Sequence, residues 1–209
     1  MSITIQKLFE VTVQGSRPIE PLPAGRWAAA RGLWAAEFTG QSLKAFVPKN
    51  DCQFDMIWIS QNPGTWNNPN HPELYTNNTF DWLAWNAHYQ EGQDIPHWRN
   101  IRKAIARIVA GKPIRILFTN SYFFEWPNGR YSTEEVAEWF ASRHVNLFSS
   151  LTERHAITND TLVCLCGQYA QKSWPRLNGN LPAFAKTPYK LGHPAHGHLA
   201  RSLRLLFPP

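Results

Sequence analysis

At its centre the sequence reads Asp55-Met56-Ile57-Trp58-Ile59-Ser60-Gln61-Asn62-Pro63-Gly64-Thr65, a short apolar run that ends in a polar turn. A continuous apolar run of this length predicts a strand that is buried on both faces, as in parallel sheets. Pro63 and Gly64 turn the chain sharply where the strand ends. Asn62 is therefore presented at the carboxyl end of a strand, where open α/β sheets bind their ligands.

Three further apolar runs follow this stretch, and helical patterns separate them. Strands are predicted over residues 114–118, 161–166 and 189–192, and helices over residues 97–110, 132–151, 168–174 and 197–207. Ser132 and Glu135 form the capping box that opens one of these helices. This alternation predicts an α/β fold, with a single three-layer α/β/α domain over residues 1–209 and a central, mainly parallel four-stranded sheet.

Residues 1–50 are expected to form N-terminal elements that pack on this core. Residues 3–14 are predicted to form a strand or a frayed element, and residues 16–25 a loop. Residues 26–38 are predicted to form a helix, because their aromatic and leucine residues have a helical spacing. A loop rich in Asn, Pro and Gly over residues 63–79 leads to a second helical start at residues 80–88.

The composition favours a globular protein with an anionic partner. A chain of 209 residues can bury a full core, and 43% apolar against 17% charged residues argues against disorder. The net charge is +6 and the isoelectric point is about 9.4. A positive balance of this size favours nucleic acid or another polyanion as the partner.

The three cysteines favour a reducing compartment. Cys164 and Cys166 alternate within an apolar run, so their side chains point to opposite faces of a strand and do not pair. Three thiols also exclude a four-cysteine zinc or iron–sulfur site within one chain. Since no leader or membrane-spanning apolar run is found, we expect a cytoplasmic protein with no membrane partner.

Polar residues follow the ends of all four predicted parallel strands. Asn62, Asn120, Gly167 and His193 occupy these positions. Parallel strands end at the same edge of a sheet, so we expect the four residues to converge on one site.

In type and order these motifs resemble those of the uracil-DNA glycosylase superfamily. That family has Gly-x-Asn-Pro-Gly after its first core strand, an asparagine after its second, Gly-x-x-Ala-Gln-Lys after its third and His-Pro-Ser after its last. The corresponding segments here are Ser60-Gln61-Asn62-Pro63-Gly64, Leu117-Phe118-Thr119-Asn120, Gly167-Gln168-Tyr169-Ala170-Gln171-Lys172 and His193-Pro194-Ala195. The resemblance runs from about residue 54 to residue 204.

The resemblance implies a monofunctional DNA glycosylase. Such an enzyme hydrolyses the N-glycosidic bond of uracil or a 5-modified pyrimidine flipped out of DNA, and leaves an abasic site. His193 would donate a hydrogen bond to the base oxygen on which negative charge develops. Asn62 would orient the attacking water. Asn120 would pair with the polar edge of the base, because an amide carries both a donor and an acceptor.

Gln61 and Gly64 are expected to line the base site, and an aromatic ring is expected to stack on the base. Phe80 is the preferred ring over Trp66 and Tyr75. Gly64 stands where the best-known branch has a tyrosine that blocks the 5-position of the pyrimidine. This predicts a roomier pocket that accepts 5-modified pyrimidines.

The last motif also departs from the family pattern. Ala195 replaces a serine that contacts a DNA phosphate, and Gly197 stands where a leucine enters the duplex. We therefore expect the DNA partner to be single-stranded or a locally unstable duplex. Phosphate contacts are expected from a cationic set close to this motif: Lys190, His196, His198 and Arg201.

Several alternatives stay open at the level of sequence. A non-catalytic nucleic-acid-binding module on the same fold is the second hypothesis, and an unrelated α/β hydrolase or nucleotide-binding protein is the third. The histidines at 193, 196 and 198 allow a zinc reading, but no cysteine or carboxylate beside them completes a ligand set. We expect a monomer without metal or cofactor, acting in base-excision repair or in defence against phage with modified DNA.

Overall fold

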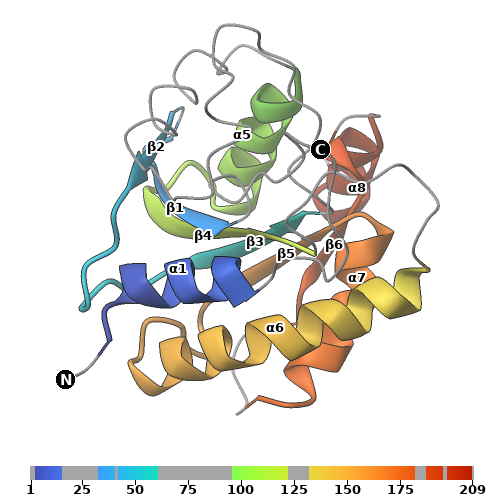
Figure 1. Cartoon of the computed structure of the whole chain (residues 1–209). Helices are drawn as coiled ribbons and strands as arrows, with labels where there is room; N and C mark the ends of the chain where they lie inside the picture. Colours follow the sequence, from blue (N-terminus) through green and yellow to red (C-terminus); the bar gives the residue numbers. More distant parts are fainter. Residues whose placement is uncertain are drawn as a thin grey trace, which may run out of the picture.

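A mixed sheet of six strands forms the middle layer of the part of the chain that the structure, a computed structural model, describes (Figure 1). The described residues are 3–15, 33–40, 42–60, 96–121, 132–181, 187–194 and 197–208. The spatial order of the strands is β2-β1-β4-β3-β5-β6. Their bounds are β1 Leu33–Phe38, β2 Leu43–Phe46, β3 Met56–Ser60, β4 Ile114–Asn120, β5 Leu162–Cys166 and β6 Tyr189–Leu191.

The strands predicted from the apolar runs are present and are mutually parallel. β3 lies between β4 and β5, and β6 pairs with β5. The first four residues of β3 are buried and only Ser60 is partly exposed, as expected of a strand covered on both faces. The predicted four-stranded sheet is nevertheless too small, because β1 pairs antiparallel with β4, and β2 pairs antiparallel with β1.

The helix predicted over residues 26–38 is wrong, because its second half forms strand β1. Residues 33–36 are all buried, and this segment pairs with β4 along its whole length. A strand buried on both faces has no alternation of polar and apolar residues, so its sequence is easily taken for a helix. Residues 26–32 lie outside the described part.

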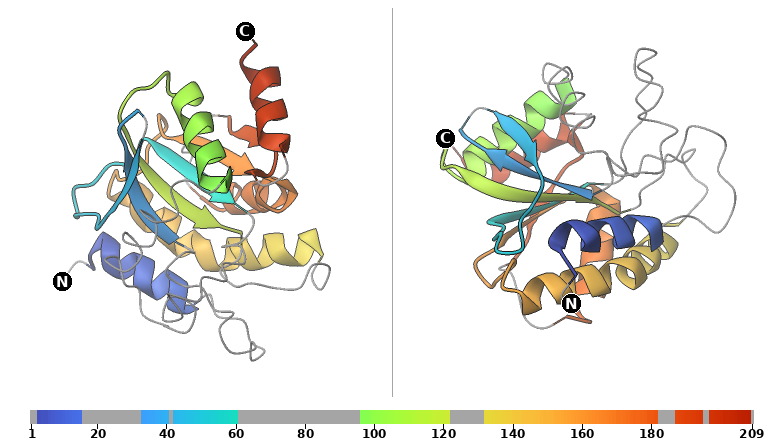
Figure 2. Two further views of the ribbon diagram at one scale, coloured as in Figure 1. Left: turned by 90° about the horizontal axis from the view of Figure 1, so that it is seen from above. Right: turned by 60° about the vertical axis from the view of Figure 1, so that its left-hand side comes forward.

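Helices cover both faces of the sheet. α1 (Ile5–Gly15), α6 (Thr133–Glu153) and α7 (Gln168–Asn178) lie on one face, and α5 (Pro96–Ile108) and α8 (His198–Leu206) lie on the other (Figures 1 and 2). α5, α6, α7 and α8 correspond to predicted helices, and α7 extends past its predicted end. None of the helices in the described ranges is long and apolar enough to cross a bilayer.

Helix α1 corrects the strand or frayed element expected at the N-terminus. Ile5, Leu8, Phe9 and Thr12 are buried, and their spacing of three and four residues is that of one helix face. The Phe9 ring stacks on Phe54, with ring centroids 6.4 Å apart. This contact attaches α1 to the segment that leads into β3.

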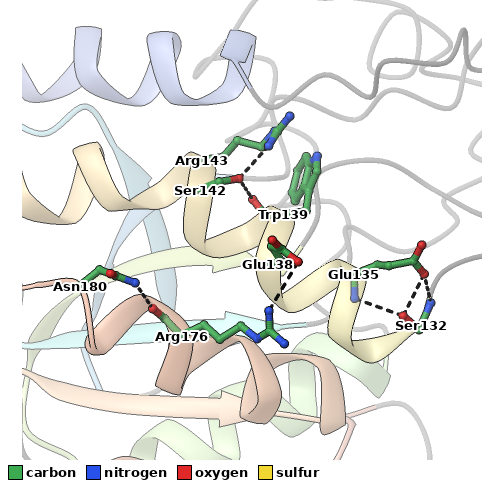
Figure 3. A network of polar contacts seen from close by, with 8 residues as sticks. All are labelled: Ser132, Glu135, Glu138, Trp139, Ser142, Arg143, Arg176 and Asn180. Carbon is green, nitrogen blue, oxygen red and sulfur yellow. Dashed lines mark hydrogen bonds and ion pairs between the residues drawn. The ribbon is translucent and has the colours of Figure 1, made fainter.

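Figure 3 shows polar contacts on the neighbouring helices α6 and α7. The capping box that the sequence predicts is confirmed: the Ser132 hydroxyl accepts from the backbone N–H of Glu135, whose carboxylate accepts from the backbone N–H of Ser132. Between the two helices, Arg176 pairs with Glu138 at 3.6 Å. This exposed ion pair contributes at most about 1 kcal/mol, so the buried faces of the two helices supply most of the packing energy.

Candidate functional site

The carboxyl ends of the four parallel strands are level with one another. Ser60 of β3 pairs with Asn120 of β4, and Cys166 of β5 pairs with Leu191 of β6. β3 and β5 pair at Ile59 and Leu165. The next residues of these two parallel strands, Ser60 and Cys166, are therefore level as well. The chain continues from β3 to β4 on one side and then returns to β5 on the other. In doubly wound sheets, the edge beside such a reversal is where ligands bind.

The side chain of Asn120 points to the α5 face of this edge. Phe118 lies on that face, because its ring contacts Trp98 of α5 at a centroid distance of 6.1 Å. Thr119 points the other way, since its hydroxyl hydrogen-bonds His144 of α6. Successive strand residues alternate between faces, so Asn120 returns to the α5 side. Asn120 is only 7% exposed, which places its amide at the boundary of the core.

His193 lies on the same face of the same edge. Its ring faces His97 in the first turn of α5, with ring centroids 6.3 Å apart. A Cβ atom added at Gly167 would lie 3.8 Å from Cδ2 of His193, so the imidazole lies over the glycine that ends β5. The sheet thus aligns Asn120, Gly167 and His193, three of the four strand-end residues predicted from the sequence, along one edge, and His193 lies next to Gly167. Three inter-strand spacings, about 14 Å in all, separate β4 from β6.

Backbone contacts fix the segment that carries His193. The amide of Asn100 in α5 donates to the carbonyl of Pro194 at 3.2 Å. The Gln171 side chain donates to the carbonyl of Leu191 at 3.0 Å, and the backbone N–H of Gly167 donates to the same carbonyl at 2.9 Å. His193 therefore lies between two anchored residues. A group held in this way can act without reorganising.

Ser121 ties the end of β4 to the end of β3. Its backbone N–H and its hydroxyl both donate to the carbonyl of Ser60, at 2.8 and 3.1 Å. The indole N–H of Trp58 donates to the Ser60 hydroxyl at 3.2 Å. These three bonds fix the point from which the chain leaves β3 toward Asn62.

Burial keeps the imidazole of His97 neutral. Burial, the larger cause, and the neighbouring His193 together lower the pKa of His97 to about 4. The His97 ring makes a T-shaped contact with Trp98, which in turn makes T-shaped contacts with Trp34 and Phe118, two rings that stack on each other. At neutral pH His97 therefore places an uncharged ring beside His193.

We predict that this partly buried histidine makes the fold sensitive to acid. The pKa of His97 is lower in the folded chain than in the unfolded one, where it is about 6.5. Stability is therefore complete above pH 6.5 and falls as the pH drops toward 4, because the unfolded chain binds the proton first. Between pH 7 and pH 5, wild type should lose about 1–2 kcal/mol more unfolding free energy than His97→Asn. Urea unfolding at both pH values measures this, and an equal loss in the two proteins would contradict it.

His144 adds a second acid-sensitive group on the opposite face. Its Nδ1 lies 3.0 Å from the Phe140 carbonyl, which can only accept, so Nδ1 carries the proton and the Thr119 hydroxyl donates to Nε2. Complete burial lowers the pKa of His144 to about 3. His144 is present in both wild type and His97→Asn, so its contribution to the pH dependence cancels when the two proteins are compared.

Gly192 has no room for a side chain. A Cβ atom there would lie 2.5 Å from the backbone carbonyl carbon and oxygen of His198, and neither can move without displacing α8. We predict that Gly192→Ala destabilises the fold by roughly 1–3 kcal/mol and displaces the adjacent His193. Thermal unfolding measures the first effect. Gly179→Ala is the control, because Gly179 has a helical φ of −65° and a milder closest contact of 3.3 Å. Equal melting temperatures for the two variants would contradict the prediction.

Several residues predicted for the site lie outside the described part of the chain. These are Gln61, Asn62, Gly64, Phe80 with its alternatives Trp66 and Tyr75, Ala195 and His196. Of the residues predicted to contact phosphate, Lys190, His198 and Arg201 are described, and all three are exposed. Gly197 has a left-handed φ of +69° at the start of α8, a conformation that favours glycine over leucine.

The described residues offer little for nucleophilic or metal chemistry. All three cysteines are buried, and burial raises the pKa of Cys52 to about 11, so this thiol stays protonated. No group of three potential metal ligands is found among the described residues. His196 is outside them, so the three-histidine cluster is not described as a whole.

The sequence did not predict that α5 contributes residues to the candidate site. His97 and Asn100 contact the His193 segment although about one hundred residues separate them along the chain. Pro96 at the first helical position was a usable signal for where α5 begins. No local pattern pairs His97 with His193, because the contact exists only once the sheet has formed.

Comparisons of the chain with protein-family models, with curated proteins and with solved structures give no match. The functional assignment therefore depends on the residues at the carboxyl edge of the sheet.

Proposed function

We propose that this protein is a monofunctional DNA glycosylase that releases uracil or a 5-modified pyrimidine from DNA. One observation carries the proposal: Asn120 and His193, residues of the types that such a reaction needs, lie on the same face of the same sheet edge. The order of the motifs along the chain agrees with this role.

The chemistry requires a base that leaves with negative charge and a sugar that gains positive charge. A donor aimed at the departing base oxygen stabilises that charge, and we assign this role to His193, whose ring lies next to Gly167 and to His97 of α5. Asn120 offers one donor and one acceptor to the edge of a flipped base. Asn62, two residues after β3, is proposed to hold the water that attacks the sugar carbon. No lysine is assigned a catalytic role, so we propose no Schiff-base step.

Gly64 sets the expected base preference. It leaves the 5-position of the pyrimidine without a blocking side chain, so 5-hydroxymethyl and larger groups should be accepted. We propose that the protein acts as a cytoplasmic monomer, in repair or against modified phage DNA. The DNA is proposed to be single-stranded or locally unpaired, because Gly197 starts α8 and provides no apolar wedge.

A panel of oligonucleotides tests the proposal. Each carries uracil, 5-hydroxymethyluracil or a larger 5-substituted pyrimidine at one position, and alkali reveals abasic sites after incubation. We expect cleavage of at least one 5-substituted strand at a rate above that of plain uracil, and loss of cleavage in Asn62→Ala. Absence of cleavage in the whole panel would reject the activity and favour a non-catalytic nucleic-acid-binding module. Faster release of plain uracil than of every 5-substituted base would reject the roomier pocket alone.

A further inference from the structure

Helices α5 and α8 lie side by side and begin at the same edge of the sheet as the candidate site (Figures 1 and 2). At their starts, Asn100 donates to the carbonyl of Pro194, close before α8. At their ends, the Arg107 guanidinium donates to the carbonyl of Phe207. α5 leads into the amino end of β4 and α8 follows the carboxyl end of β6, so both helices run away from the site in the same direction.

These two helices carry cations and no carboxylates. α5 has Arg99, Arg102, Lys103 and Arg107, and α8 has Arg201 and Arg204, whereas neither sequence contains Asp or Glu. Arg99, Lys103 and Arg107 are exposed and four residues apart, which aligns them along one side of α5 over about 12 Å. Arg201 and Arg204 are exposed on α8. We call these five exposed residues the basic face.

The helices on the opposite side of the sheet are balanced in charge. α1, α6 and α7 together carry four cations against five carboxylates. Three of these four cations have an acidic partner: Lys7 pairs with Glu10 at 3.0 Å and Lys172 with Glu134 at 3.4 Å. Arg176 pairs with Glu138 at 3.6 Å, as Figure 3 shows. Among the helices that the structure describes, the excess of positive charge therefore lies on α5 and α8, the layer that borders the candidate site.

We propose that the basic face binds the sugar–phosphate backbone of the DNA strand where it leaves the candidate site. This inference rests on the proposed function, because it takes DNA as the partner. A line of exposed cations on helices whose own sequences contain no Asp or Glu is suited to bind phosphates regardless of base sequence. The amino ends of both helices add partial positive charge at the site itself. DNA is favoured over an anionic membrane because the line of cations starts in the first turn of α5, where His97 and Asn100 contact the segment that carries His193.

The test compares two double variants that remove the same charge from opposite layers. Lys103→Gln with Arg204→Gln changes the basic face, and Lys172→Gln with Arg176→Gln is the matched control on α7. Fluorescence anisotropy measures the binding of each intact protein to a labelled single strand that contains no modified base. In the basic-face variant, the slope of log affinity against log salt should become shallower by about 1.4, with about tenfold weaker binding near 0.1 M salt. The control should match wild type.

Each outcome decides for or against the basic face. Equal slopes in the two variants, or a wild type that binds no DNA, would overturn the proposal.

Since Leu205 on α8 is 77% exposed, the binding of both variants to vesicles of anionic phospholipid is measured as well. A larger loss of vesicle binding than of DNA binding would assign the basic face to membranes instead. If the variant loses salt-dependent binding but no base is ever excised, the basic face stands and the glycosylase proposal fails. If excision occurs and the slope is unchanged, the glycosylase proposal stands and the basic face fails. Circular dichroism checks that both variants fold.

Discussion

Replacing His193 with alanine should lower the rate of base excision by roughly 100-fold or more under single-turnover conditions. The imidazole is the proposed donor to the departing base, and the bonds made by Asn100 and Gln171 to the flanking carbonyls do not involve it. The variant should therefore fold normally and fail in the chemical step.

An exposed histidine at the other edge of the sheet provides the control for this experiment. His155 lies between α6 and β5, at the amino end of that strand, and has a left-handed φ of 56° that asparagine tolerates. His155→Asn should excise at the wild-type rate. A His193→Ala protein that is as fast as wild type would remove His193 from the mechanism.

Replacing Asn120 with aspartate should reduce excision by a similar factor, roughly 100-fold. Aspartate has nearly the same shape, but its carboxylate has no N–H donor for the acceptor on the edge of the pyrimidine. A site whose polar groups are left unpaired discriminates strongly against the mismatched ligand. The loss should appear in excision on saturating DNA, because the phosphate contacts are unchanged.

The burial of Asn120 requires a second variant, because a new charge at a residue that is 7% exposed also costs stability. Asn120→Ala removes the amide without adding charge and should be equally slow. Asn178→Asp, at the exposed end of α7, controls for the added charge. Excision at the wild-type rate in Asn120→Ala would show that this residue does not read the base.

The sequence predicts the parallel core well and the antiparallel edge poorly. β3, β4 and β5 were predictable because continuous apolar runs ending in Gly, Asn or Pro are typical of buried parallel strands. β1 was not, because residues 33–36 are buried and resemble a helix as much as a strand. Helix α1 had the helical spacing of Ile5, Leu8, Phe9 and Thr12, which the prediction of a strand overlooked.

The candidate site was predictable where it depends on strand ends. Asn120 and His193 lie at the edge that parallel topology dictates. The contributions of His97, Asn100 and Gly192 come from contacts between distant segments, which no local pattern encodes. The closeness of Gly192 to His198 is a property of how α8 packs against β6, and only coordinates reveal it.

The most direct test of the account is the identity of the products. Wild type, His193→Ala and Asn120→Ala are each incubated with the best substrate of the oligonucleotide panel, and mass spectrometry follows the strand and the small molecules released. We expect wild type to yield a free pyrimidine base and an unbroken strand with an abasic sugar, and both variants to yield neither on the same timescale. Release of no base by wild type, or equal release by either variant, would contradict the claim that these two side chains form one base-excision site.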